Sequence, residues 1–205
     1  MTRVLLTAFE PYGRWKENSS WRTLIELTRE LPATPRVTTR LYPVDSQQMR
    51  EKLREDLAAG HDFAIHLGQA PGASAMRIET FALNVEGDPE RCDEQLPVLV
   101  NGAPPAYQVE LPVHQWARQI RHSGVPAVVS YHAGIYLCNA TLYYSCHFCS
   151  QERLPTKSVF IHLPLMPSQT LHHAEEVPST PVPLMASALR QILATLSATS
   201  PSISS

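Results

Sequence analysis

The sequence predicts an α/β fold with a mainly parallel twisted sheet that is covered by helices on both faces. Short apolar runs rich in β-branched residues alternate along the chain with longer runs whose apolar residues recur at helical spacing. Glycine, proline and capping residues stand between these runs. Strands that are separated by helices pair in parallel order, so this alternation predicts one central sheet.

The first part of the chain predicts strand, helix and strand. Residues 3–9 are a short apolar run typical of a strand. Residues 20–30 carry apolar side chains at helical spacing, and Ser19 or Ser20 can cap the helix that they predict. Residues 36–41 contain β-branched side chains and predict the second strand.

A second helix and two further strands follow. Residues 46–59 predict a charged amphipathic helix, with Ser46 as its cap and Gly60 as its stop. Residues 63–67 form the kind of apolar run expected of a strand buried on both faces. Residues 78–85 are another strand candidate.

The middle of the chain contains an irregular segment before the alternation resumes. Residues 88–112 are rich in proline and charge and predict an excursion rather than a linker between domains. A helix is expected at residues 113–123, a buried strand at 125–130 and a helix at 139–151.

The last part of the chain completes one domain. Residues 158–162 predict a strand, and the proline-rich residues 164–181 separate it from an amphipathic helix at 183–196 with proline at its start. We therefore expect a single domain over residues 1–196. Residues 197–205 are rich in Ser, Thr and Pro and predict a disordered tail.

Composition limits the classes of function. The 205 residues suffice for one substantial core, and 43% hydrophobic with 18% charged residues indicates a globular chain. The net charge of −2 argues against a nucleic-acid partner, and no apolar run is long enough to span a membrane. The N-terminus lacks a signal-peptide pattern, which predicts a cytoplasmic protein whose four cysteines are free thiols.

Cys138 is the most informative residue. It lies between the strand expected at 125–130 and the helix expected at 139–151, so it would sit at a helix start. The unpaired N–H groups and the dipole there stabilise a thiolate. His162 ends the strand at 158–162, at the edge where α/β folds gather reactive groups. A thiol with an imidazole that takes and returns its proton predicts acyl-transfer chemistry.

Glu79 is the best candidate for a group that orients the histidine. It follows the loop that leaves the strand at 63–67, and such loops lie at the carboxyl edge of the sheet, together with Cys138 and His162. A carboxylate there would fix the imidazole tautomer and stabilise the imidazolium.

Five segments in order along the chain resemble one known family. They are Phe9-Glu-Pro-Tyr-Gly13 with Asn18-Ser-Ser-Trp21, Gly68-Gln-Ala with Glu79 and Ala82-Leu-Asn84, Gly102-Ala-Pro-Pro-Ala-Tyr107 with Leu111-Pro112, Ala133-Gly-Ile-Tyr-Leu-Cys-Asn139, and Phe160-Ile-His162 with Leu163-Pro164. Together they resemble the motifs of pyroglutamyl peptidase I (pyrrolidone-carboxylate peptidase), a family of cysteine peptidases. The histidine also stands at that family's spacing of 24 residues from the cysteine.

The resemblance implies a thiol protease that removes an N-terminal pyroglutamyl residue from peptides through an acyl-enzyme. It implies a single three-layer α/β/α domain, assembly as a dimer or tetramer of identical chains, and no metal or organic cofactor. The family's catalytic residues fall on Cys138, His162 and Glu79. Its substrate-binding residues fall on Phe9, Tyr12 and Gln69. The aromatic rings of Phe9 and Tyr12 suit a flat lactam without a charged amine.

Departures from the family pattern keep a second hypothesis open. Pro71, Gly72 and Ala73 replace the usual glycine and arginine region, and Thr80 replaces a basic residue. Tyr12 replaces a phenylalanine, and Tyr131-His132 replaces another pair near the cysteine. A catalytically weak relative that binds pyroglutamyl peptides, or acts as a scaffold, is therefore the alternative.

Two further hypotheses come from other classes. Cys146-His-Phe-Cys149 has the CxxC spacing of metal and redox sites, with Cys92 or His172-His173 as the available further ligands. The pair lies well inside an expected helix, however, and helix packing is the simpler explanation. A nucleoside-binding protein would rest on sheet topology alone, and a fold does not determine a function.

Overall fold

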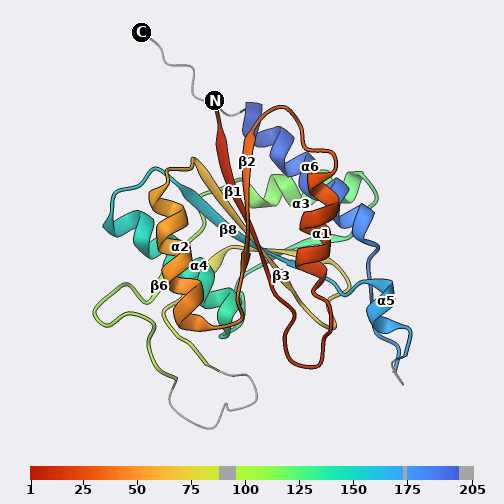
Figure 1. The fold of residues 1–205 in the computed structure, drawn as a ribbon, viewed down its shortest axis with the longest axis horizontal. Coiled ribbons are helices and arrows are strands. Elements are labelled where there is room, and N and C mark those ends of the chain that lie inside the picture. Colours follow the sequence, from red (N-terminus) through yellow and green to blue (C-terminus); the bar gives the residue numbers. More distant parts are fainter. Residues whose placement is uncertain (88–95, 173–174, 199–205) are drawn as a thin grey trace.

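A six-stranded sheet forms the middle layer of the computed structural model, which describes residues 1–87, 96–172 and 175–198 (Figure 1). The strand order across this sheet is β2-β1-β3-β8-β4-β7. The strands are β1 (Arg3–Phe9), β2 (Arg36–Tyr42), β3 (Phe63–Gln69), β4 (Met76–Glu79), β7 (Ala127–Ser130) and β8 (Lys157–Leu163).

Helices cover both faces of the sheet, so the expected three layers are present (Figure 1). Helices α2 and α4 pack together on one face, while α1, α3 and α6 cover the other face. The helices are α1 (Ser19–Thr28), α2 (Ser46–Ala58), α3 (Val113–His122), α4 (Leu137–Gln151), α5 (Pro167–Thr170) and α6 (Val182–Ala198).

The sheet is mostly parallel, as the alternation of strands and helices predicted. Strands β2, β1, β3 and β8 run in the same direction. The reversal comes at β4, which is antiparallel to β8 and parallel to its other neighbour, β7. The carboxyl ends of β4 and β7 therefore point away from the carboxyl end of β8. Glu79 follows the loop that leaves β3, as expected, and it is the last residue of β4, which runs back from that edge of the sheet.

The single strand expected at 78–85 is two strands. The chain changes partner at Thr80, whose N–H and hydroxyl both donate to the carbonyl of Ser130, while its own carbonyl accepts from the N–H of Val109. Beyond Thr80, β5 (Phe81–Leu83) pairs with β6 (Ala106–Gln108) in a small antiparallel sheet. Strand β6 lies within the expected excursion at 88–112, so the described part of it, residues 96–112, is more regular than the sequence suggested; residues 88–95 lie outside the described residues.

Two helix caps differ from the expected serines. Asn18 caps α1 by accepting from the N–H of Ser20, and Asp45 caps α2 by accepting from the N–H of Gln48. Both capping residues have extended backbones, and the serines that follow them are already helical. Asn and Asp are at least as favourable as Ser at the N-cap position, so each helix is capped by the residue before the expected serine.

Strand β7 and helix α6 also differ slightly from the prediction. Strand β7 lies at an edge of the sheet and its Val128 is 44% exposed, so the run at 125–130 is not a fully buried strand. Helix α6 continues to Ala198, two residues into the expected tail, and residues 199–205 of that tail lie outside the described residues. Within the described ranges, no helix has the length and apolar character needed to cross a membrane.

Candidate active site

Cys138 is the second residue of α4, as its place between strand and helix predicted. The loop from β7 turns at Gly134, which has φ +78°, a conformation that glycine adopts without strain, and then enters the helix at Leu137. The side chain is partly exposed. The first N–H groups of a helix have no partner within it, so the thiol stands beside donors and the positive end of the helix dipole.

Gly68 lets the end of β3 approach this sulfur. A Cβ atom at Gly68 would lie 3.1 Å from Sγ of Cys138 and 2.6 Å from Cζ of Phe160, closer than side chains pack. Gly68 is also the direct neighbour of His162 across β3 and β8. The bare backbone at this position therefore makes room for the thiol beside the imidazole.

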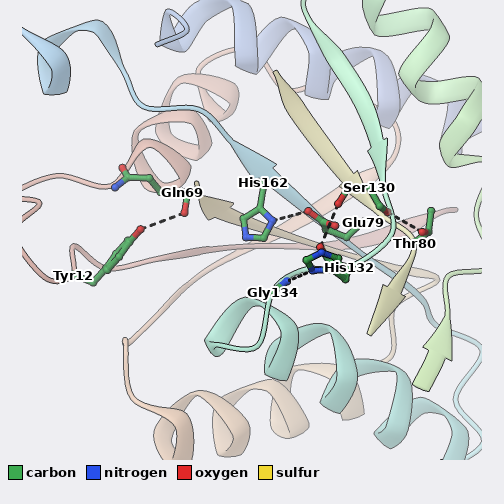
Figure 2. Close-up of polar contacts among 8 residues, drawn as sticks. All are labelled: Tyr12, Gln69, Glu79, Thr80, Ser130, His132, Gly134 and His162. Atoms are coloured by element: carbon green, nitrogen blue, oxygen red, sulfur yellow. Dashed lines mark hydrogen bonds and ion pairs between the residues drawn. The ribbon is translucent and has the colours of Figure 1, made fainter. Parts of the chain in front are cut away.

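His162 and Glu79 form a buried pair. Nδ1 of His162 lies 2.7 Å from Oε1 of Glu79, and Figure 2 shows this contact. The register explains it, because Arg77 is the direct partner of His162 on the antiparallel strand, and Glu79 lies two residues further on the same face. Glu79 is only 1% exposed, so its carboxylate is held against the ring.

The electrostatics favour a charged imidazole. Burial lowers the pKa of His162, but the neighbouring Cys138 and the hydrogen-bonded Glu79 outweigh this effect and raise the pKa to about 9. An imidazolium between a sulfur and a carboxylate is the arrangement that holds a proton ready for transfer to a leaving group. The structure thus brings together the three residues that the sequence singled out for catalysis.

A cavity of about 260 Å³ opens beside Cys138 and His162. Its lining is mainly apolar, which suits an uncharged ring. The lining residues are Phe9, Tyr12, Asn18, Val44, Gly68, Gln69, Ala133, Gly134, Ile135, Tyr136, Leu137, Cys138 and His162. We call this cavity the slot.

Phe9 and Tyr12 both line the slot, but in different ways. Phe9 is 4% exposed, and its ring packs between those of Tyr42 and Phe160, so it forms a fixed wall. Tyr12 is half-buried and donates its hydroxyl to the backbone carbonyl of Gln69 at 3.3 Å (Figure 2). Burial, followed by the nearby sulfur of Cys138, raises the pKa of Tyr12 to about 12, so the phenol stays protonated.

Gln69 lines the slot, yet Figure 2 shows its side-chain amide turned away from His162. Its Oε1 accepts from the N–H of Ser19 and from Nε2 of Gln169, both at 2.8 Å. Gln69 was predicted from the sequence, but Gln169 was not, because it lies in the proline-rich segment 164–181, where no motif indicates a functional residue. Asn18, Val44 and Ile135 were not predicted as lining residues either.

The departures from the family pattern lie around this site. Tyr131 is 63% exposed, and Nδ1 of His132 accepts from the N–H of Gly134 in the turn before α4 (Figure 2). Thr80 points its hydroxyl at the carbonyl of Ser130 and so secures the neighbouring strand end. None of these contacts disturbs the pair formed by His162 and Glu79.

The CxxC pair lies within α4, as expected. Burial raises the pKa of Cys146 to about 12 and also raises the pKa of Cys149, which disfavours the thiolates that metals and disulfide exchange require. In the part of the chain that the structure describes, no three His, Cys, Asp or Glu side chains form a metal-binding group. Cys92 and His173 lie outside the described residues, and His172 is exposed.

Comparison with known proteins points to one family. The family model described as pyroglutamyl peptidase matches residues 2–199. The chain is 34% identical to the pyrrolidone-carboxylate peptidase of Pyrococcus furiosus, with 82% of this chain and 84% of that protein covered. It is 37% identical to that of Chromobacterium violaceum, with 84% and 82% covered.

Solved structures agree with the sequence comparisons. The pyrrolidone carboxyl peptidase of Fervidobacterium islandicum superimposes with a TM-score of 0.89 at 32% identity, covering 96% of this chain and 98% of that one. The enzyme from Thermococcus litoralis gives a TM-score of 0.87 at 29% identity, covering 97% and 94%. The match extends over nearly the whole chain in sequence and in fold, and the chain therefore belongs to the pyroglutamyl peptidase family of cysteine peptidases.

Proposed function

We propose that this chain removes an N-terminal pyroglutamyl residue from peptides, with Cys138 as the nucleophile, His162 as the general acid and base, and Glu79 as the orienting carboxylate. The observation that carries the proposal is the charged pair of His162 and Glu79 beside a thiol at a helix start, all next to an apolar slot. Family membership supports the same activity.

The slot suits the pyroglutamyl ring. This ring is flat and uncharged, and it lacks the free α-amine that other aminopeptidase substrates present, so its site needs no carboxylate for a cation. Apart from Cys138 and His162, the slot is lined by aromatic, aliphatic and neutral polar residues. Phe9 and Tyr12 would contact the ring faces, and the hydroxyl of Tyr12 and the backbone at Gln69 would provide polar partners.

The first half of the reaction forms an acyl-enzyme. The Cys138 thiolate attacks the carbonyl carbon that follows the lactam ring, and the oxygen takes the electron pair. Backbone N–H groups at the start of α4, including that of Cys138, stabilise this oxyanion. His162 then gives its proton to the nitrogen of the scissile bond, and the shortened peptide leaves as a free amine.

The second half releases the acyl group. His162, now neutral, takes a proton from a water molecule that attacks the thioester. The tetrahedral intermediate expels the Cys138 thiolate, and His162 is again positively charged. Glu79 stabilises the imidazolium at the beginning and end of the cycle, because its carboxylate stays 2.7 Å from Nδ1.

Turnover of a fluorogenic pyroglutamyl amide tests the proposal. We expect hydrolysis of this amide and little of the matching prolyl or glutaminyl amide, because only the lactam is both cyclic and uncharged. Cys138→Ala should remove the activity, and mass spectrometry of the wild-type protein should detect an acyl group on Cys138. A chain that binds the amide without turnover, or a Cys138→Ala variant with wild-type turnover, would refute the proposed activity or its nucleophile, respectively.

A further inference from the structure

Gln169 lies outside the catalytic groups, but its side chain joins two segments that form one side of the slot. It belongs to the short helix α5, which follows β8 and lies beside the loop before α1 (Figure 1). Its Nε2 donates to Oε1 of Gln69 at 2.8 Å and to the backbone carbonyl of Glu17 at 3.0 Å. Its Oε1 accepts from the N–H of Met166 at 2.9 Å.

Gln69 and Gln169 form a hydrogen-bonded pair, which we call the glutamine pair. The Oε1 atom of Gln69 accepts from Gln169 and also from the N–H of Ser19, the first residue of α1. Gln69 is 4% exposed, its bond to Ser19 is buried and its bond to Gln169 is partly buried. A hydrogen bond away from water is stronger than one exposed to water, and its loss is more costly. The glutamine pair therefore ties residues 17–19 to the end of β3.

These tied segments define the slot. Asn18 lies between the two tied residues of the loop and lines the slot. Tyr12 belongs to the same loop, and its hydroxyl bonds to the backbone carbonyl of Gln69 on the other tied segment. Tyr12 and Asn18 of this loop, Gln69 of β3 and Cys138 all line the slot, so a movement of the loop away from β3 would change the space in the slot.

We propose that Gln169 is a positioning residue for substrate binding, which holds the loop before α1 against β3 so that the slot keeps the width of a lactam ring. The inference rests on the proposed peptidase function for its ligand. Gln169 acts through Gln69 and the loop, and it does not touch Cys138, His162 or Glu79 in any contact that the described residues show.

If Gln169 only stabilised the fold, its replacement would destabilise the whole domain, and the structure gives no reason to expect this. Helix α5 contains no buried residue, and Gln169 itself is partly exposed, so replacing it opens no cavity in the core. The charged pair of His162 and Glu79 is bonded independently. Loss of the glutamine pair should therefore weaken substrate binding and leave the chemistry intact.

The first experiment compares Gln169→Met with Thr170→Val. Methionine keeps the length of the side chain and removes its amide. Thr170 is the matched control, because among the residues that the structure describes its hydroxyl bonds only to the carbonyl of Pro167 within α5. We expect Gln169→Met to raise KM for the pyroglutamyl amide by roughly fivefold to tenfold, the loss expected for about one to two net hydrogen bonds, with kcat within about twofold. Thr170→Val should leave both parameters unchanged.

A double-mutant cycle tests the connection through Gln69. If Gln169 acts through Gln69, then Gln169→Met should add little to the KM of a Gln69→Met variant, because the shared contact is already lost. Gln169→Glu should behave like Gln169→Met, because a carboxylate keeps the contact with the N–H of Met166 but cannot donate to Gln69 or Glu17.

Amide hydrogen exchange provides a readout that does not need turnover. The N–H of Ser19 should exchange faster in Gln169→Met than in the wild type, and the rate at which iodoacetamide alkylates Cys138 should be equal in the two. Unchanged exchange at Ser19, or a fall in kcat with KM unchanged, would overturn the role of Gln169. A wild-type chain without turnover would instead refute the proposed function, and exchange at Ser19 would still decide whether the glutamine pair holds the loop.

Discussion

Replacing Glu79 with glutamine removes the negative charge beside His162 while preserving the shape of the contact. The glutamine Oε1 can still accept from Nδ1 of His162, which lies 2.7 Å from the carboxylate oxygen in the wild type. What changes is the electrostatic support of the imidazolium, since Glu79 is one of the two neighbours that raise the pKa of His162 to about 9. The variant therefore separates the charge of Glu79 from its geometry.

The size of the effect follows from this buried contact. A hydrogen bond to a charged group contributes about 1.5–3 kcal/mol, and one pKa unit corresponds to about 1.4 kcal/mol. In Glu79→Gln the pKa of His162 should be lower than in the wild type by roughly one to two pH units, and kcat/KM should fall by roughly tenfold to a hundredfold. The group is buried, so screening by solvent does not reduce this expectation.

The assay is kcat/KM for a pyroglutamyl amide across the neutral and alkaline range. In the wild type, activity should decline on the alkaline side as His162 loses its proton near its pKa of about 9. In Glu79→Gln this decline should begin at a pH lower by roughly one to two pH units. Glu55→Gln, which removes an exposed carboxylate on α2, serves as the control for net charge. Coincident alkaline limbs for the wild type and Glu79→Gln would refute the reasoning.

The other predictions concern the groups around the site. His66 is completely buried between Thr7 and Ser145, and burial lowers its pKa to about 3. In the unfolded chain this histidine gains a proton below about pH 6.5, whereas in the folded chain it stays neutral. Between pH 7 and pH 5 the free energy of unfolding should therefore drop by about 2 kcal/mol more in the wild type than in His66→Gln. Urea unfolding measures this difference, and equal drops would contradict the prediction. Gly68→Ala should cost about 1–3 kcal/mol of stability and most of the activity, because its Cβ would stand 2.6 Å from Phe160; a variant with wild-type melting and turnover would argue against the close approach. At neutral pH iodoacetamide should alkylate Cys138 before Cys146, whose pKa burial raises to about 12; mass spectrometry of the labelled peptides checks the order, and earlier labelling of Cys146 would count against it.

Local patterns in the sequence predicted the strand and helix boundaries around the candidate site, but they could not predict the direction of every strand. The strand-to-helix boundary before Cys138 and the strand ending near His162 are local patterns, and both are present. The direction of β4 is not a local pattern, because a four-residue strand reads alike in either orientation. Only its pairing with β8 shows that Glu79 reaches His162 from a strand running the other way.

Contacts between distant segments explain the remaining differences. Thr80 ends one sheet and begins another because Ser130 and Val109 lie beside it, and both are far away in the sequence. Gln169 was passed over for the same reason, since its partners stand 100 and 152 residues away. Asn18 was within reach of sequence reasoning, because an asparagine directly before a helix is a recognised cap.

The contact between Glu79 and His162 depends on the register in which β4 pairs with β8. Side chains on a strand alternate between faces, so sliding β4 by one residue would rotate Glu79 to the opposite side and leave the imidazole without its anion. The strand is anchored at both ends, because the N–H of Met76 donates to the carbonyl of Pro126 and the N–H of Thr80 donates to the carbonyl of Ser130. A single inserted residue that shifted this register would therefore separate Glu79 from His162 and turn Met76 and Ile78 out of their places in the core, whereas an insertion confined to the loop before Met76 would leave the pair intact.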